Sequence, residues 1–282
     1  MARMARRPEI RLHAEPPAAT AAGAVVLAAE FPFAGRNVAL HVEVPDRRLS
    51  LADVVPLARE VCDRLTEAVI GAVQAAGRDI SCRKGCGVCC TNHLVPLTVP
   101  EAFRLQQEFD ALPAGRRGEL DRAFTGAAEE VDESGLAEDY GRLDKADPLS
   151  ERRQRDLAGK WWSQRHFPCP LLARDACSLY PFRPIPCREF LVVSPPERCA
   201  TNTETRVRRP FSVHDVLADW AAEMEGTAPT LVLLPNFLPW TQGKVSRSQR
   251  TWRGPGMVRR WLDRLTATAA QADAGYAGPV PT

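Results

Sequence analysis

The sequence predicts an α+β protein that is mainly helical, and three observations lead to this fold class. Apolar residues alternate with polar ones over residues 38–44, as in a half-buried strand. Over residues 57–69 apolar residues recur every four positions, as on one face of an amphipathic helix. Residues 166–199 contain many prolines, which exclude long helices. We therefore expect an N-terminal β-hairpin and several helices around an irregular, cysteine-rich core.

The hairpin is expected from two apolar segments, residues 24–30 and 37–44, that are separated by a short connection. An amphipathic helix follows over about residues 50–77. Ser50 or Asp53 can cap its first turn, because both side chains accept hydrogen bonds from free backbone N–H groups.

Cys62 lies on the apolar stripe of this helix, which predicts a buried structural cysteine. Thr98 and Glu101 have the spacing of a capping box and mark the start of the next helix. The remaining expected elements are a helix over 115–134, an acidic connection over 129–148, helices over 149–165, 212–226 and 255–272, and a short strand and turn over 230–240.

Four segments follow from this organisation. They are a flexible tail (1–20), an N-terminal hairpin and helix (21–78), a cysteine-cluster metal-binding domain (79–205) and a C-terminal helical extension (206–282).

Composition narrows the class of protein. The chain has 282 residues and 45% hydrophobic residues, which is ordinary for a globular protein. Its 37 Lys and Arg nearly balance 35 Asp and Glu, so total charge makes no case for nucleic acid or an anionic membrane. No apolar stretch approaches the roughly 20 residues of a membrane span. The abundant Arg, Ala and Pro are typical of a high-GC bacterial genome.

Two smaller features have simple interpretations. Residues 244–254 are locally basic and could contact phosphate, although a solvated loop is the more ordinary explanation. Six tryptophans could form a binding surface, although aromatic residues at helical positions more often belong to a core. These tryptophans are Trp161, Trp162, Trp220, Trp240, Trp252 and Trp261.

The cysteines are the main candidates for functional residues. Acidic residues and prolines interrupt any signal-like N-terminus, so we expect a cytosolic protein, in which structural disulfides are rare and clustered thiols are more often metal ligands. Eight of the nine cysteines form two groups of four about 80 residues apart. The first group is Cys82, Cys86, Cys89 and Cys90, and the second is Cys169, Cys177, Cys187 and Cys199.

The first group has the spacing of a metal knuckle, with glycines around Cys86 that allow a tight turn. The same spacing would also place the four thiols on one face of a helix. Adjacent Cys89 and Cys90 do not comfortably reach one small ion, so we expect them to serve two metals or one larger cluster, or one of them to bind metal while the other stays a free thiol. Thiolates suit both zinc and iron, so an iron–sulfur cluster and one to two zinc ions both stay open. Disulfides and eight independently buried thiols are the weaker alternatives.

Other side chains near the cysteines are candidates for supporting roles. Arg183 and Arg188 are expected to bind the cofactor by balancing thiolate charge or to hold an anionic substrate, and ordinary ion pairs, for example with Glu189, are the alternative. His93 and His166 lie close to the two groups, and we expect them outside the ligand set. Tyr180 is expected to pack over the centre. No phosphate loop, dinucleotide fingerprint or nucleophile triad is present.

The segments CRKGCGVCC, FPCPLL and ACSLYPFRPIPCREF resemble the YkgJ-type cysteine-cluster family, which is described as a zinc- or iron-chelating domain. The resemblance covers about residues 80–200, and Leu179 stands where the family usually has isoleucine. The positions that correspond are Cys82, Cys86, Cys89, Cys90, Cys169, Cys177, Arg183, Pro184, Cys187 and Arg188. A similar cluster occurs in flagellin lysine N-methylases.

Three functional hypotheses follow. The first is a metal-binding protein that holds an iron–sulfur cluster or one to two zinc ions through the eight cysteines. The second is an enzyme, either an iron–sulfur oxidoreductase or a protein-modifying enzyme similar to the flagellin methylases. The third is a scaffold in which zinc fixes the fold and a protein partner binds the tryptophan-bearing C-terminal region.

Overall fold

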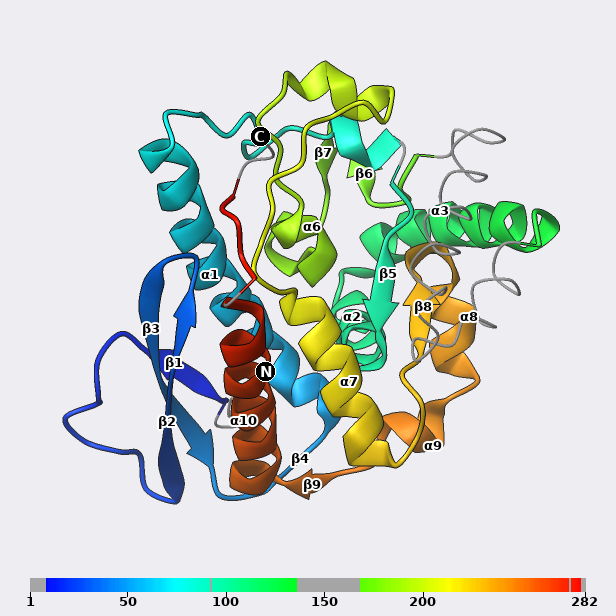
Figure 1. The fold of residues 1–282 in the computed structure, drawn as a ribbon. Coiled ribbons are helices and arrows are strands. Elements are labelled where there is room, and N and C mark those ends of the chain that lie inside the picture. Colours follow the sequence, from blue (N-terminus) through cyan, green and yellow to red (C-terminus); the bar gives the residue numbers. More distant parts are fainter. Residues whose placement is uncertain (1–8, 92, 136–167, 274, 280–282) are drawn as a thin grey trace.

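The computed structural model describes residues 9–91, 93–135, 168–273 and 275–279, and within them helices and small sheets are mixed (Figure 1). The α+β prediction is confirmed. The helix expected over residues 149–165, with Trp161 and Trp162, and His166 lie outside the described residues.

The strands and the longer helices follow a simple order along the chain. They are β1 (Arg11–His13), β2 (Ala24–Phe33), β3 (Arg36–Pro45), β4 (Arg48–Leu49), α1 (Val55–Ala75), β5 (Pro96–Thr98), α2 (Val99–Asp110), α3 (Ala114–Glu133), β6 (Leu172–Ala173), β7 (Ala176–Cys177), α6 (Ile185–Glu189), α7 (Val213–Glu225), β8 (Leu231–Leu233), α8 (Phe237–Gln242), α9 (Val245–Ser248), β9 (Trp252–Arg253) and α10 (Gly254–Asp273).

Short 3₁₀ helices occur between these elements. They are η1 (Leu51–Val54), η2 (Val88–Thr91), η3 (Tyr180–Phe182), η4 (Pro196–Ala200) and η5 (Leu234–Asn236).

The predicted N-terminal hairpin is confirmed. Strands β2 and β3 pair in antiparallel register across a two-residue turn, in which Ala34 and Gly35 both have positive φ angles, of 52° and 76°. Such a turn matches the natural twist of the two strands. Strand β1 pairs with the other edge of β3, so the tail expected over residues 1–20 contains a strand. A strand of three residues is too short to show an alternating pattern, so sequence reasoning missed it.

The main core lies between the inner face of this sheet and helices α1, α7 and α10 (Figure 1). Leu40, Val42 and Val44 of β3 are completely buried, as their alternation predicted. Trp220 of α7 and Trp261 of α10 are completely buried as well. The N-terminal hairpin and the C-terminal helix therefore share one core, although the sequence suggested two separate segments.

A second core joins α2, α3 and the segment that begins at β8. Phe109, Phe124 and Phe237 meet edge to face, the last two with ring centroids 4.7 Å apart. Strand β5 pairs with β8, as expected for a short strand over residues 231–233. The predicted helices at α1, α2, α3, α7 and α10 are all present, and Ser212 caps α7 through the N–H of Asp215.

Residues 168–199 are irregular, as predicted. This segment contains two strands of two residues each and α6, a helix of five residues. A helix this short does not persist without tertiary contacts. The metal predicted to organise this segment stays a prediction.

In the part of the chain that the structure describes, no helix combines the length and the apolar character that crossing a bilayer requires.

The predicted burial of Cys62 is confirmed, because its side chain on α1 is completely inaccessible in the main core. We expect Cys62→Ser to lower the free energy of unfolding by about 1–3 kcal/mol, because a hydroxyl replaces a thiol in apolar surroundings. Cys62→Ala is the control and should cost less, about 1 kcal/mol. Urea unfolding measures both values. A serine variant as stable as the natural chain would contradict the core assignment.

Candidate functional site

The first cysteine group lies on a tight loop between α1 and β5. The N–H of Cys86 donates to the carbonyl of Arg83 at 3.0 Å, and that of Cys90 donates to the carbonyl of Gly87 at 2.9 Å. Gly85 has a φ of 90°, in the left-handed region where glycine is favoured. Of the two geometries that the spacing allowed, the structure has the knuckle loop followed by the 3₁₀ turn η2.

The second cysteine group packs directly against this loop. The N–H of Cys169 donates to the carbonyl of Cys90 at 2.7 Å, which joins the two groups through the backbone. Gly87 lies so close to the carbonyl of Asp175, in the β6–β7 turn, that any Cβ at this position would clash with it. Cys177 ends β7, opposite Leu172. Gly87, one of the glycines that the sequence marked, is therefore required for the approach of the second group.

The last two cysteines reach the loop from other elements. Cys187 lies in the middle of α6, and Cys199 lies in η4, which packs against η2. The thiol of Cys82 is 3.8 Å from the carbonyl of Phe190, just after α6. Ser81 donates its N–H to the carbonyl of Val192 at 2.9 Å, which places the chain before Cys82 alongside the segment that leads to Cys199.

These elements surround a cavity of about 230 Å³. Five of the eight predicted ligands line it: Cys82, Cys86, Cys89, Cys187 and Cys199. Lys84, Tyr180 and Arg183 are also in its wall. Cys169 and Cys177 are not part of the cavity wall, and they pack with Cys187 against the second core.

Cys89 is the electrostatic centre of the group. A hydrogen bond with Cys90 and burial together raise the pKa of the Cys89 thiol far above its usual value. Negative charge on Cys89 in turn contributes to the raised pKa of five other thiols, which burial causes in the first place. These five are Cys82, Cys169, Cys177, Cys187 and Cys199. The direct link between the two groups is the backbone hydrogen bond from Cys169 to Cys90.

Burial is the main cause of the other raised pKa values. It raises the pKa of Cys169 and of Cys199 to about 12 and that of Cys187 well above the ordinary thiol value. The protein by itself thus favours neutral thiols at this site. Thiolates form here only if positive charge enters the site or already lines it.

Arg183 is the cation that the fold places at the thiols. Its positive charge lowers the pKa of four thiols, those of Cys82, Cys89, Cys177 and Cys187. Larger effects still raise each of these pKa values: the hydrogen bond with Cys90 for Cys89, and burial for the other three. Its guanidinium lies 4.4 Å from the ring centroid of Tyr180, and its buried Nε has no hydrogen-bond partner among the described residues.

Tyr180 covers the cavity, as expected. Its ring faces Arg183 and, at 5.7 Å, the ammonium group of Lys84. Two cations therefore hold this ring in the cavity wall.

Arg188, which the sequence assigned to the cofactor together with Arg183, also lines the cavity and is held by several further bonds. It is buried and bonded to Asp63 of α1 at 2.6 Å. It also donates to the carbonyls of Arg183 at 3.0 Å and Pro181 at 2.6 Å. These bonds fix the loop that carries Arg183 onto α1, so Arg188 positions the site.

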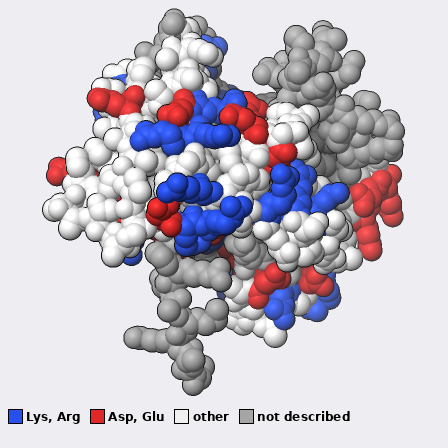
Figure 2. All heavy atoms as spheres, turned by 90° about the horizontal axis from the view of Figure 1, so that it is seen from below, with Lys and Arg blue, Asp and Glu red and all other residues white. Residues whose placement is uncertain are grey.

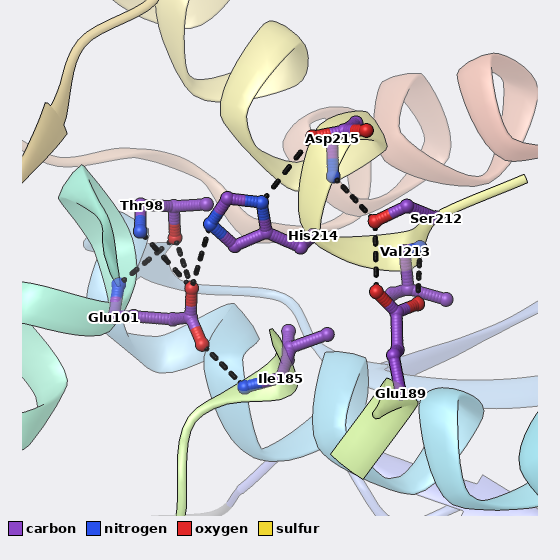
Figure 3. Close-up of polar contacts among 8 residues, drawn as sticks. All are labelled: Thr98, Glu101, Ile185, Glu189, Ser212, Val213, His214 and Asp215. Carbon is purple, nitrogen blue, oxygen red and sulfur yellow. Dashed lines mark hydrogen bonds and ion pairs between the residues drawn. The ribbon is translucent and has the colours of Figure 1, made fainter. Parts of the chain in front are cut away.

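Two buried carboxylates hold α6 in place, and the sequence did not reveal this role (Figure 3). The capping box correctly placed Glu101 at the start of α2, where it accepts hydrogen bonds from the N–H and hydroxyl of Thr98 at 3.0 and 2.9 Å. Its second oxygen accepts the N–H of Ile185, the first residue of α6, at 2.7 Å. His214 of α7 lies 3.8 Å from the same carboxylate.

Glu189 fixes the other end of α6. Its carboxylate accepts hydrogen bonds from the hydroxyl of Ser212 at 2.8 Å and the N–H of Val213 at 2.7 Å, at the start of α7 (Figure 3). Burial raises the pKa of Glu189, and Arg209, 3.7 Å away, opposes this shift. The ion pair of Glu189 is thus with Arg209 rather than with Arg183 or Arg188.

His93 is placed outside the cavity wall. Its ring packs edge to face on Phe190 with centroids 4.4 Å apart. Burial, with a smaller contribution from Arg206, lowers the pKa of His93 to about 4, so its 3.9 Å approach to Glu204 is not a charged pair at neutral pH. This position agrees with the expectation that His93 is not a ligand.

The thiols surround the cavity without converging on one point. Among the described residues, which include all nine cysteines, no three Cys, His, Asp or Glu side chains are placed to hold one metal ion, and no disulfide is formed. The donor chemistry suits a thiolate-bound centre.

Known proteins give no further assignment: no family model, no curated protein and no solved structure matches the chain.

The role of Glu101 can be tested with Glu101→Gln, which replaces one acceptor oxygen with a donor facing either Thr98 or Ile185. We expect the free energy of unfolding to fall by about 1–3 kcal/mol, because one buried N–H loses its acceptor. We also expect faster alkylation of Cys187 in the reduced, metal-free protein, measured by mass spectrometry. Glu119→Gln, at an exposed position on α3, is the matched control. Unchanged Cys187 reactivity would contradict the positioning role.

Proposed function

We propose that this chain is a metal-binding protein whose centre is held by the two cysteine groups. The observation that carries the proposal is that three cysteines of the first group and two of the second line one cavity, although about 80 residues separate the two groups in the sequence. The proposed ligands are Cys82, Cys86, Cys89, Cys90, Cys169, Cys177, Cys187 and Cys199. Eight thiols gathered without disulfides in a segment of low regular structure are a pattern that metal ligation would explain.

The electrostatics support the same proposal. Burial holds the thiols in the neutral form, and Arg183 provides one positive charge against many potential negative ones. A bound metal ion or cluster would supply the remaining positive charge and would favour the thiolate form of its ligands. When bound, such a centre supplies electron transfer if it contains iron and a structural cross-link if it contains zinc.

An iron–sulfur cluster is the form of centre that we favour. A water molecule occupies about 30 Å³ in the liquid, so a cavity of about 230 Å³ is far larger than a single ion needs. The thiols lie around this space rather than at one point, and a cluster accepts ligands that are spread in this way. One to two zinc ions are the alternative, and they would require the thiols to move inward on binding.

An enzyme is the second candidate, and one observation favours it. An open groove of about 440 Å³ adjoins the cavity, and the two share Thr66, Tyr180, Arg183 and Arg188 in their walls. A substrate of an oxidoreductase or of a protein-modifying enzyme could approach the centre along this groove. The expected compartment is a reducing cytosol, in which such thiols stay reduced.

The scaffold hypothesis has less support. Trp220 and Trp261 are completely buried in the main core, so they are not available to a protein partner. Trp240 and Trp252 are partly buried and are the tryptophans of the described C-terminal region that a partner could still reach.

Anaerobic purification followed by metal and sulfide analysis tests the proposed centre. We expect iron and acid-labile sulfide in stoichiometric amounts with a brown visible spectrum, and we expect Cys89→Ser to lose most of the metal because Cys89 lines the cavity with thiols of both groups. Cys62→Ser is the matched control and should retain it. A colourless protein that contains stoichiometric zinc would show that the centre is zinc and not an iron–sulfur cluster. A natural chain that is folded and contains no metal would contradict the proposal.

Arg183→Gln tests the charge at the site. Thiols release protons when they bind metal, so zinc binding strengthens as pH rises towards their pKa values. Loss of Arg183 raises those pKa values further, so we expect the pH of half-maximal zinc binding to rise by roughly half a unit or more. A zinc titration of the reduced, metal-free protein at several pH values measures this shift. Arg198→Gln, at an exposed position beside Cys199, is the control and should leave the pH unchanged.

A further inference from the structure

Strands β4 and β9 place two arginines directly opposite each other. Arg48 faces Arg253 in this antiparallel pair, and both are exposed, with 77% of the Arg253 side chain accessible. Like charges at directly opposed positions destabilise a strand pair. The Arg48 guanidinium donates to the hydroxyl and carbonyl of Thr251, whereas the Arg253 guanidinium pairs with Asp46, so the two charged groups point apart along the strand pair.

The backbone around this pair is built for close approach. The N–H of Gly254 donates to the carbonyl of Arg47 at 2.8 Å. A Cβ on Gly254 would lie 2.8 Å from the carbonyl oxygen of Pro45 and 2.9 Å from that of Arg47, which is closer than real Cβ atoms come. Only glycine at this position lets the chain after β9 lie against the turn before β4.

Four further cations lie in the two chain segments that β4 and β9 join. The basic face consists of Arg47, Arg48, Lys244, Arg247, Arg250 and Arg253. Figure 2 shows the molecule from below, with Lys and Arg side chains gathered across this side and smaller groups of carboxylates among them. The six cations come from two segments about 200 residues apart, and the pairing of β4 with β9 joins those segments.

Two carboxylates neutralise only part of this charge. Glu225 is buried and bonds Arg247 at 2.6 Å, with Arg250 at 3.5 Å. Asp46 pairs with Arg253 at 3.2 Å, in an exposed ion pair of the kind that contributes little and exchanges readily. Lys244 is exposed and has no ion pair among the residues that the structure describes. The face thus keeps an excess of positive charge.

Indole rings lie between the cations. The Arg250 guanidinium is 5.3 Å from the ring centroid of Trp252, and the Arg247 guanidinium is 5.6 Å from that of Trp240. Both tryptophans are partly exposed. Arginines combined with accessible aromatic rings are the means by which proteins bind single-stranded nucleic acids, through phosphate contacts and base stacking. Val245 is the one large apolar side chain that is exposed in this region of the described chain, which gives a membrane little to bury.

We propose that the basic face binds single-stranded nucleic acid through its phosphate backbone, with Lys244 and Arg253 as the central contacts. The face lies at the end of the molecule that carries β4 and β9, whereas β6 and β7 of the cysteine site lie toward the opposite end (Figure 1). The inference does not rest on the proposed metal centre, and the two can fail separately.

Fluorescence anisotropy with labelled single-stranded RNA and DNA of about 20 nucleotides tests the proposal on the full chain. We expect Lys244→Glu/Arg253→Glu to weaken binding at least about tenfold. The slope of log affinity against log salt should fall by about 1.4, because two phosphate contacts are lost. Arg117→Glu/Arg122→Glu, at exposed positions on α3, makes the same charge change elsewhere and should bind normally.

A stability measurement separates ligand binding from a structural role. Arg253→Glu changes a mostly exposed side chain whose surface ion pair with Asp46 contributes little to stability. We therefore expect this single variant to bind less tightly while its melting temperature stays within a few degrees of that of the natural chain. Equal binding by the natural chain and the double variant would overturn the proposal. Binding to phosphatidylserine vesicles without binding to either oligonucleotide would overturn it as well.

Discussion

The buried carboxylate of Glu101 is the interaction on which the cysteine site depends most. It joins three elements, because it caps α2 through Thr98, accepts the first N–H of α6 and lies beside His214 of α7. A five-residue helix has too few internal hydrogen bonds to stand alone. With Glu189 at its other end, Glu101 gives α6 a defined position between two longer helices, and Cys187 takes its place at the cavity from that position.

In the cysteine site, burial and metal ligation favour opposite protonation states of the thiols. Burial favours neutral thiols, whereas metal ligation requires thiolates. Arg183 partly reconciles these demands, since its charge acts on four of the thiols and its buried Nε has no partner in the described chain. Arg188 serves a different purpose beside it, because its bonds to Asp63 and to two carbonyls fix the loop. Two arginines in one motif thus have separate roles.

The distribution of charge matters more than its total. The near balance of acidic and basic residues made no case for a nucleic-acid partner, because total charge does not report how charge is distributed on the surface. The fold instead brings the basic segment after α8 against the turn before β4 and places Arg48 opposite Arg253. A chain with little net charge can therefore carry one face that is strongly positive.

Local patterns in the sequence determined much of the secondary structure and the list of candidate ligands. Alternation identified the β2–β3 hairpin, four-residue spacing identified α1 and the buried Cys62, and the capping box identified the start of α2. Each of these signals acts between residues that are close in the chain. The cysteine spacing likewise marked both groups, because ligand knuckles are local motifs. Tertiary structure alone decided how these parts meet. The bond from Cys169 to the carbonyl of Cys90, the second role of Glu101, the difference between Arg183 and Arg188 and the pairing of β4 with β9 all join residues far apart in the sequence. No local periodicity reports such contacts, because they depend on which buried surfaces pack together when the chain folds. The sequence therefore identified the thiols, and the packing of the core determined that five of them line one cavity.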